Sequence, residues 1–106
     1  MAHEALPTTY AEKVLDLVAS IPAGRVMAYS DVAAALGRGG ARQVGQALAR
    51  FGVGVPWWRV VRADGSCAPG LAAEQLRQLQ AEDAPMVPRT VSSLDRIDMA
   101  KARWTP

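Results

Sequence analysis

The sequence predicts a mainly α-helical domain with one small β-hairpin, arranged as a winged helix-turn-helix. Apolar residues recur at helical spacing in four segments. A glycine-rich turn separates two of these segments, and a short apolar stretch runs into an Asp-Gly turn signal. The chain has 106 residues, of which 50% are hydrophobic and 21% are charged, as expected for one globular unit. We therefore expect residues 1–106 to form a single domain.

The first helix is expected to begin at a capping box formed by Thr9-Tyr10-Ala11-Glu12. Apolar residues then recur at helical spacing as far as Ile21. Pro22-Ala23-Gly24 is typical of a helix stop, and residues 25–29 resemble a short extended connection.

Two further helices and the turn between them predict a helix-turn-helix. Ser30 is the expected N-cap of the second helix, which includes residues 32–36 and ends at Gly37. After a glycine-rich turn, residues 41–51 again have helical spacing. The polar face of this third helix carries long hydrogen-bond donors that could enter a groove of DNA, namely Arg42, Gln43, Gln46 and Arg50. The third helix is the candidate recognition helix.

The second half of the chain predicts a wing and a final helix. Residues 57–61 are expected to be extended, and Asp64-Gly65 is a strong hairpin turn signal. Residues 71–82 predict the last helix, with Leu76 and Leu79 facing inward. The tail that follows contains two prolines, so we expect an irregular strap packed on the domain.

Positive charge is concentrated in the middle of the chain. Residues 25–62 contain six arginines and one acidic residue, a net charge of +5, whereas the whole chain carries +2. Guanidinium groups match phosphates and base edges geometrically, so this distribution favours a nucleic-acid partner. The alternative is an ordinary solvated basic face.

Other classes of protein are disfavoured by the sequence. No apolar run approaches the roughly 20 residues that cross a bilayer. The first residues lack the basic and apolar stretches of a secretion signal, which predicts a cytoplasmic protein. Cys67 is the single cysteine, so we expect neither an internal disulfide nor a structural metal site. We also expect no cofactor.

The stretch from Ile21 to Val61 resembles the DNA-binding domain of the O6-alkylguanine-DNA alkyltransferases. The pieces that carry the resemblance are IPAGRVMAYSDVAAALG, ARQVGQALAR and PWWRVV. In that family an arginine matching Arg42 fills the gap left by a guanine rotated out of the duplex, and a tyrosine matching Tyr29 crowds the neighbouring phosphate. The resemblance therefore implies base flipping, with the recognition helix in the minor groove.

The reactive motif of that family, Pro-Cys-His-Arg-Val, is Pro56-Trp57-Trp58-Arg59-Val60 in this chain. An indole has no ionisable thiol, so the alkyl acceptor is lost and no alkyl transfer is expected. This replacement is similar to that of the alkyltransferase-like proteins. Those proteins bind O6-alkylguanine in double-stranded DNA without repairing it and pass the lesion to nucleotide excision repair proteins. The resemblance implies the same partners here, for a monomer associated with the nucleoid.

The site expected from this resemblance has two parts, and each residue also has a structural alternative. The residues expected to contact DNA are Tyr29, Ser30, Arg42, Gln43 and Gln46. The residues expected to form the lesion pocket are Val55, Pro56, Trp57, Trp58 and Arg59. Trp57 could instead be a core aromatic, Arg59 an ion-pair former and Ser30 only a helix cap. For Trp58 the core alternative is favoured, because the family histidine at its position faces inward and a large indole packs well there.

Two departures from the family pattern leave rival functions open. Trp58 replaces the usual histidine and could rearrange or partly fill the pocket, and Ala68-Pro69-Gly70 offers no basic side chain to lie over a flipped base. One rival is therefore a winged-helix DNA-binding or transcription-regulating protein without lesion selectivity. The other is an alkyltransferase that uses Cys67, although no histidine lies near it in sequence to activate the thiol.

Overall fold

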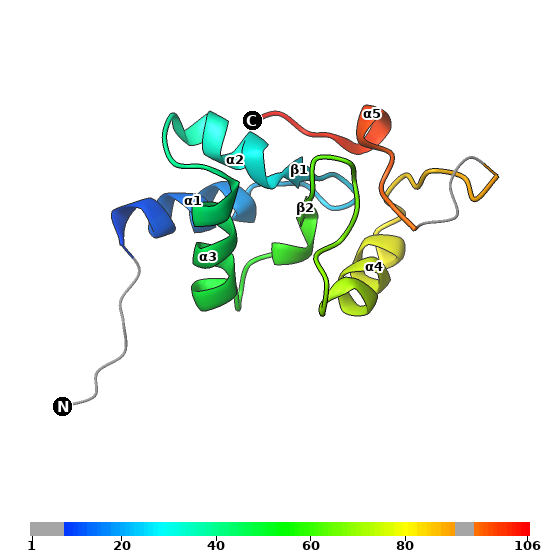
Figure 1. Cartoon of the computed structure of the whole chain (residues 1–106), viewed down its shortest axis with the longest axis horizontal. Coiled ribbons are helices and arrows are strands. Elements are labelled where there is room, and N and C mark those ends of the chain that lie inside the picture. The colour runs from blue at the N-terminus through cyan, green and yellow to red at the C-terminus, as the bar shows by residue number, and fades with distance from the viewer. Residues whose placement is uncertain (1–7, 91–94) are drawn as a thin grey trace.

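Three helices form one side of the molecule, and two short strands lie between them and the C-terminal helices (Figure 1). The structure, a computed structural model, describes residues 8–90 and 95–106. The elements in chain order are α1 (Thr9–Ala19), β1 (Met27–Ala28), α2 (Tyr29–Leu36), α3 (Ala41–Phe51), the 3-10 helix η1 (Trp57–Arg59), β2 (Val60–Val61), α4 (Ala72–Ala81) and α5 (Met99–Ala102). The predicted mainly helical fold with a small sheet is confirmed. Among the described residues, no helix is long and apolar enough to cross a membrane.

The first helix begins one residue earlier than the sequence predicted, and the second begins two residues earlier. The side-chain oxygen of Thr8, not of Thr9, accepts a hydrogen bond from the amide of Ala11 at 3.1 Å. The expected cap of α2 at Ser30 is also wrong, because that helix begins at Tyr29. The carboxylate of Asp31 instead accepts from the amide of Ala28 at 3.0 Å and satisfies a donor at the start of the helix.

The turn between α2 and α3 depends on glycine. Gly39 has a φ of +75°, which L side chains rarely adopt, and a Cβ there would clash with the hydroxyl of Tyr10. That hydroxyl donates to the backbone oxygen of Arg38 at 3.1 Å, so α1 holds the turn directly. Helix α3 then has the predicted bounds, and α1, α2 and α3 pack on one another. The predicted helix-turn-helix is therefore present.

The two strands pair differently from the predicted hairpin. Strands β1 and β2 are parallel, with Met27 opposite Val60 and Ala28 opposite Val61. The chain does turn near Gly65, which has a φ of +86°. After that turn it contacts the C-terminal segment instead of folding back as a strand, and the amide of Ile97 donates to the oxygen of Gly65 at 2.9 Å. Strand β2 therefore pairs with β1, and not with the segment that follows the turn at Gly65.

The buried side chains form two clusters that meet at β2. One cluster lies among α1, α2 and α3 and includes Val60. The other includes Val61 together with Leu79 of α4 and Ile97. Because successive side chains of a strand point to opposite faces, adjacent valines reach the two clusters. The strand therefore fixes the helix-turn-helix relative to α4.

The C-terminal tail forms the expected strap and also contains the short helix α5. The amide of Val26 donates to the oxygen of Ala102 at 3.0 Å, and the amide of Trp104 donates back to the oxygen of Val26 at 2.8 Å. The guanidinium of Arg25 adds a bond to the oxygen of Ala102 at 3.0 Å. The strap therefore lies along the segment that leads into β1.

Candidate functional site

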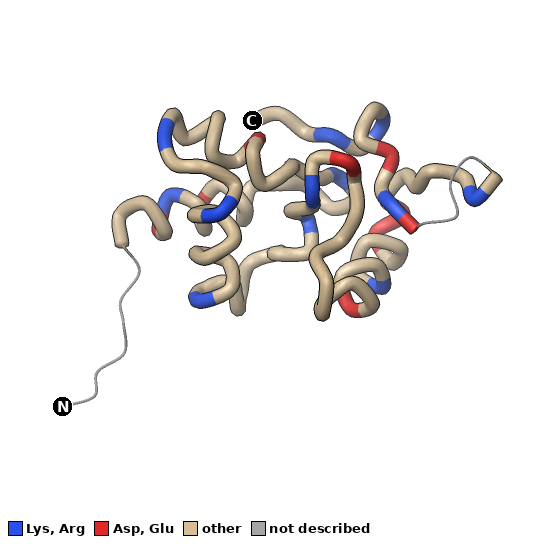
Figure 2. The backbone as a smooth tube through the Cα atoms, in the orientation of Figure 1, with Lys and Arg blue, Asp and Glu red and all other residues tan. Residues whose placement is uncertain are grey.

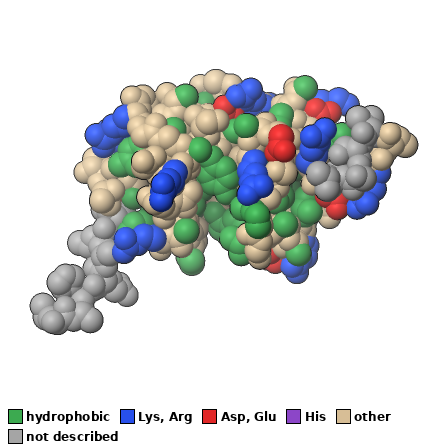
Figure 3. Space-filling model, viewed as in Figure 1, with side chains coloured by type: hydrophobic (Ala, Val, Ile, Leu, Met, Phe, Trp, Pro, Cys, Tyr) green, Lys and Arg blue, Asp and Glu red, His purple; other side chains and the backbone are tan. Residues whose placement is uncertain are grey.

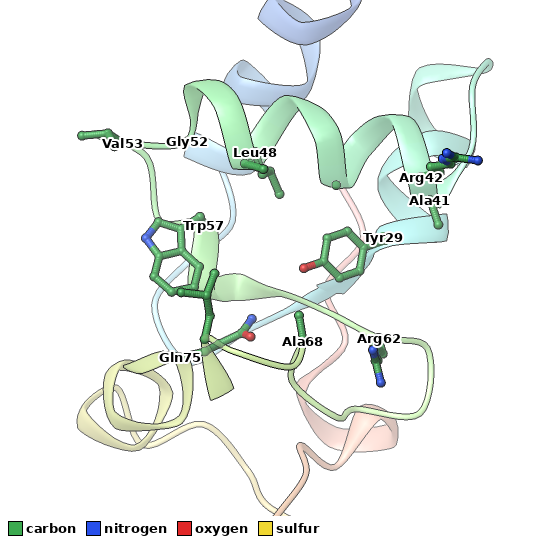
Figure 4. A pocket seen from close by; sticks show the side chains of 13 residues that line it. Tyr29, Ala41, Arg42, Leu48, Gly52, Val53, Trp57, Arg62, Ala68 and Gln75 are labelled. Atoms are coloured by element: carbon green, nitrogen blue, oxygen red, sulfur yellow. The ribbon is translucent and has the colours of Figure 1, made fainter. Parts of the chain in front are cut away.

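A cavity of about 710 Å³ lies between α3 and the start of α4 (Figure 4). Its walls come from four parts of the chain: the start of α2, one face of α3, the loop that leads into η1, and the segment from β2 to α4. The lining residues are Tyr29, Ala41, Arg42, Gly45, Leu48, Ala49, Gly52, Val53, Trp57, Arg62, Ala68, Leu71 and Gln75. Most of these side chains are apolar or small, so the cavity can accept a flat apolar group such as a base.

The cavity has an aromatic end and a basic end. Trp57 lies at one end, whereas Arg42 and Arg62 lie toward the other (Figure 4). Tyr29 lies between them, and its hydroxyl points toward the side of Trp57 in this view. Gly45 lies on the face of α3 that lines the cavity, and the ring of Tyr29 lies close to it. The arrangement can hold an aromatic ring at one end and an anionic group at the other.

The surface around the cavity carries basic residues. Helix α3 has basic residues near both of its ends and no acidic residue, whereas several acidic residues lie near α4 and α5 (Figure 2). In the space-filling view, apolar side chains occupy the centre of the face, with Lys and Arg side chains on both sides (Figure 3). Such a face attracts a polyanion and also offers it an apolar contact.

Tyr29 presents a protonated hydroxyl to the cavity. Burial raises the pKa of this phenol, the nearby Cys67 raises it further, and Arg62 opposes both effects. The net pKa lies above its ordinary value of 10.0. At neutral pH the hydroxyl therefore remains able to donate a hydrogen bond.

Trp57 and Trp58 have different environments. Their ring centroids lie 5.9 Å apart in an edge-to-face arrangement. Trp57 lines the cavity, whereas Trp58 packs against the second core cluster and its Nε1 donates to Glu82 at 3.0 Å. Trp58 is therefore not a lining residue of the cavity, contrary to its predicted place in the lesion pocket.

Arg59 also lies outside the cavity lining and forms an ion pair instead. Its guanidinium donates to both carboxylate oxygens of Glu82 and to the backbone oxygen of Ile21 at 2.8 Å. Burial by itself would raise the pKa of Glu82, but hydrogen bonds from Arg59, Gly24 and Trp58 outweigh it and lower the pKa overall. The structural alternative for Arg59 is the one that its contacts support.

Val55 and Pro56, in the loop before η1, were also predicted to form the pocket, but neither residue lines the cavity. Val55 packs against the first core cluster, and Pro56 precedes η1 without lining the cavity. A hydrogen bond of 3.2 Å from the amide of Val55 to the backbone oxygen of Gly52 closes a turn in this loop. This turn directs Val55 inward and leaves Val53 at the cavity with 98% of its surface exposed.

The residues predicted to contact DNA are divided among three locations. Tyr29 and Arg42 line the cavity. Ser30 lines a separate, shallower hollow formed with the turn of the helix-turn-helix, and Gln46 is exposed on α3. The side-chain oxygen of Gln43 accepts from the amide of Gly40 at 3.0 Å, so this residue also caps α3.

Arg62, Leu71 and Gln75 are among the lining residues that the sequence did not assign to a site. Arg62 was counted within the basic segment but was not assigned to a site. Gln75 lies one helical turn before the inward-facing Leu79, and this spacing was the available signal of a buried polar group.

Cys67 is not among the lining residues of the cavity. Partial burial raises the pKa of its thiol, and the nearby Asp95 raises it further. The thiol is therefore less ionised than an ordinary cysteine, which makes it a poorer alkyl acceptor. In the described ranges, no three side chains of His, Cys, Asp or Glu gather as potential metal ligands.

Comparison with known proteins gives the family of the chain. The family model described as the DNA-binding domain of 6-O-methylguanine DNA methyltransferase matches residues 9–84. A DNA base-flipping protein of Escherichia coli is 36% identical over 100 residues, which cover 91% of this chain and 74% of that protein. Alkyltransferase-like protein 1 of Schizosaccharomyces pombe is 31% identical over 89% of this chain and 93% of its own length. The chain belongs to the alkyltransferase-like family.

Solved structures of relatives share the fold of this alkyltransferase-like chain. The S. pombe Atl1 structure in complex with damaged DNA containing O6-carboxymethylguanine matches with a TM-score of 0.76 and 31% identity, over 92% of this chain and 95% of that one. The alkyltransferase-like chain also matches a methyltransferase of Methanothermobacter thermautotrophicus with 46% identity over 61 residues. That match covers 34% of the archaeal protein, so only about a third of its length is represented here.

Proposed function

We propose that this chain is a non-enzymatic DNA-damage recognition protein that binds O6-alkylguanine in duplex DNA, with the alkylated base turned out of the helix into the cavity. The observation that carries the proposal is the open cavity beside α3, with Trp57 toward one end and Arg42 toward the other. Its volume falls in the range of about 300–1,000 Å³ that is common for sites of small ligands. The named relatives, a base-flipping protein and a protein solved on alkylated DNA, support the same assignment.

Helix α3 would enter the minor groove so that Arg42 takes the place of the extruded base. Extrusion costs a few kcal/mol, and a side chain that fills the vacant space in the stack recovers part of that cost. Tyr29 lies between Arg42 and Trp57 in the cavity wall, where its hydroxyl can donate to the base or crowd the neighbouring phosphate. The base would then lie against Trp57, which contributes apolar contact.

No alkyl group would be transferred in this complex. In the resemblance to the alkyltransferases, Trp57 stands in the place of the reactive cysteine, and an indole cannot accept the alkyl group as a thiolate does. The single cysteine, Cys67, has a raised pKa and lies outside the cavity lining. Mass spectrometry after incubation with alkylated DNA should find an unchanged protein mass, and an adduct on Cys67 would contradict the proposal.

The central test compares the affinities for matched duplexes containing guanine or O6-methylguanine. We expect tighter binding to the alkylated duplex, and Arg42→Ala should weaken that binding strongly because the extruded base loses its substitute in the stack. Arg50→Ala is the matched control, since Arg50 is an exposed arginine of α3 outside the cavity lining. It should change the affinity for both duplexes by the same factor and keep the preference for the alkylated one. Equal affinity of the wild-type protein for the two duplexes would indicate a general DNA-binding protein instead.

We propose in addition that the complex passes the lesion to nucleotide excision repair proteins. A lesion binder without an acceptor cannot complete repair alone, so its complex must be processed by another activity. Incision of an O6-methylguanine duplex by purified excision-repair proteins should increase when this protein is added and stay low with Arg42→Ala. An unchanged incision rate would remove this part of the proposal.

A further inference from the structure

Gln75 is the one polar residue of the described part of the chain that is fully buried, and it lines the cavity. Only 1% of its surface is exposed, although it belongs to α4, whose outer face is solvated. Its side chain extends from α4 toward the space between Trp57 and Ala68 (Figure 4). Burying an amide costs free energy unless its polar atoms form hydrogen bonds, so the partners of Nε2 and Oε1 must each be identified.

The orientation of the Gln75 amide is fixed by two backbone carbonyls. Its Nε2 donates to the oxygen of Val60 at 2.7 Å and to the oxygen of Trp58 at 3.1 Å. Carbonyl oxygens only accept, so the amide nitrogen must face them and cannot exchange places with Oε1. Both amide hydrogens are therefore used within the protein. No hydrogen bond made within residues 8–90 and 95–106 uses Oε1, which leaves an acceptor at the cavity wall.

The proposed ligand, O6-alkylguanine, has one hydrogen-bond donor that could bind Oε1 of Gln75. Alkylation of O6 removes the hydrogen from N1 of guanine, so the ring nitrogens and the ether oxygen of O6-alkylguanine all accept hydrogen bonds. The exocyclic 2-amino group is the one donor left on the base edges that a pocket can reach. An acceptor that becomes covered when the base enters the cavity thus favours a base that carries this amino group.

We propose that Oε1 of Gln75 accepts a hydrogen bond from the 2-amino group of the extruded base, which makes Gln75 a specificity residue for alkylated guanines over alkylated purines that lack this group. The inference rests on the proposed function, because the base must enter the cavity. A base that fills the cavity covers Oε1, and a base without the amino group leaves this acceptor shielded from water with no partner. We expect a loss of affinity of about 10- to 100-fold.

The experiment measures affinities for three duplexes that are identical except at one position, which carries guanine, O6-methylguanine or O6-methylhypoxanthine. O6-methylhypoxanthine differs from O6-methylguanine only by lacking the 2-amino group. The wild-type protein should bind O6-methylguanine most tightly. A wild-type protein that binds the two methylated duplexes equally would overturn the role of Gln75 while leaving the proposed function intact. No preference for O6-methylguanine over guanine would overturn both.

The variant Gln75→Met tests whether Oε1 is the acceptor, since methionine has a similar shape and no amide. It should bind the two methylated duplexes equally, whereas Gln78→Met, a control on the same helix outside the cavity lining, should keep the wild-type preference. If Gln75 only supports the backbone, Gln75→Met will weaken both complexes by the same factor and retain the preference, which would overturn the proposal. Thermal unfolding checks that the variant folds, and Gln75→Leu replaces it if it does not.

Discussion

At the scale of single residues, Glu82 joins three distant parts of the chain beside the cavity. Its carboxylate accepts from the amide of Gly24 at 3.1 Å, from the indole of Trp58 and from the guanidinium of Arg59. The side chains of Arg59 and Glu82 are only 16% and 13% exposed, so this ion pair is largely shielded from water. Charge-assisted hydrogen bonds of this kind stabilise more than exposed pairs do.

Glu82→Gln should lower the free energy of unfolding by about 2 kcal/mol at neutral pH, because the hydrogen bonds lose their charged acceptor. The pKa of Glu82 is lowered in the folded protein, so its stabilising effect is present above the unfolded pKa and is lost as the pH falls through the folded value. The difference between wild type and variant should therefore shrink below about pH 4.5. Urea unfolding at several pH values measures it.

Asp83→Asn is the matched control for this prediction, since Asp83 is the exposed neighbour of Glu82 in the chain. Its stability should follow that of the wild type over the same pH range. A Glu82→Gln variant as stable as Asp83→Asn at neutral pH would contradict the role assigned to the ion pair.

Residue roles were predictable only where a motif marked them. The positions of Trp57 and Arg42 follow the family pattern, and both residues line the same cavity. No motif marked Glu82, since its partners lie far away in the sequence and no spacing indicates them. The same reason explains why Gln75 and Arg62 were missed: only the folded chain brings them to the cavity.

At the scale of elements, α3 was predicted with its observed bounds because its helical spacing is strong and glycines flank it. The start of α1 was shifted because Thr8 and Thr9 could each act as a cap, and Thr8 has the extended backbone. The start of α2 was shifted because its N-cap residue, Ala28, has no capping side chain, and Asp31 satisfies the donor instead. The stretch 57–61 was expected to be extended, but three of its residues form η1. The local spacing of apolar residues thus predicted the helices better than it predicted the short segments between them.

Gly45→Ala should stabilise the protein by up to about 1 kcal/mol, because alanine favours the interior of a helix over glycine. The added Cβ would lie 3.9 Å from Cε1 of Tyr29, an ordinary contact. Gly39→Ala, in the preceding turn, should destabilise by about 1–3 kcal/mol, since its positive φ and its contact with Tyr10 both oppose a side chain. Urea unfolding of the two variants compares them, and a change of the same sign in both would contradict this account.

At the scale of the whole molecule, the sheet was the main error, because a strand near an Asp-Gly turn is consistent with a hairpin until the rest of the fold is known. Parallel pairing needs a long connection between the strands, and here α2 and α3 provide it. The uneven charge of the chain, in contrast, was available from the sequence. The exposed Arg38 in the turn of the helix-turn-helix lies beside the shallow hollow that Ser30 also lines.

The logarithm of the binding constant for DNA should fall linearly with the logarithm of the salt concentration, because each phosphate contact releases counterions. Arg38→Ala should reduce the magnitude of this slope by about 0.9, the value for one lost contact. Arg77→Ala should leave the slope unchanged, since Arg77 lies on α4 and pairs with Glu74. Titrations at several salt concentrations provide the slopes, and equal slopes for the two variants would show that Arg38 does not bind a phosphate.

The parallel pairing of β1 and β2 limits how the cavity can adapt to lesions of different size. Strand β1 leads directly into Tyr29 and β2 directly follows η1, so the pair ties two walls of the cavity together. A slip of one residue would send Val60 and Val61 to the wrong clusters, which makes small backbone displacements along the strands unfavourable. Under the proposed function, a bulkier alkyl group would therefore be accommodated by side-chain rotation, above all of Trp57 and Arg62, around a rigid frame.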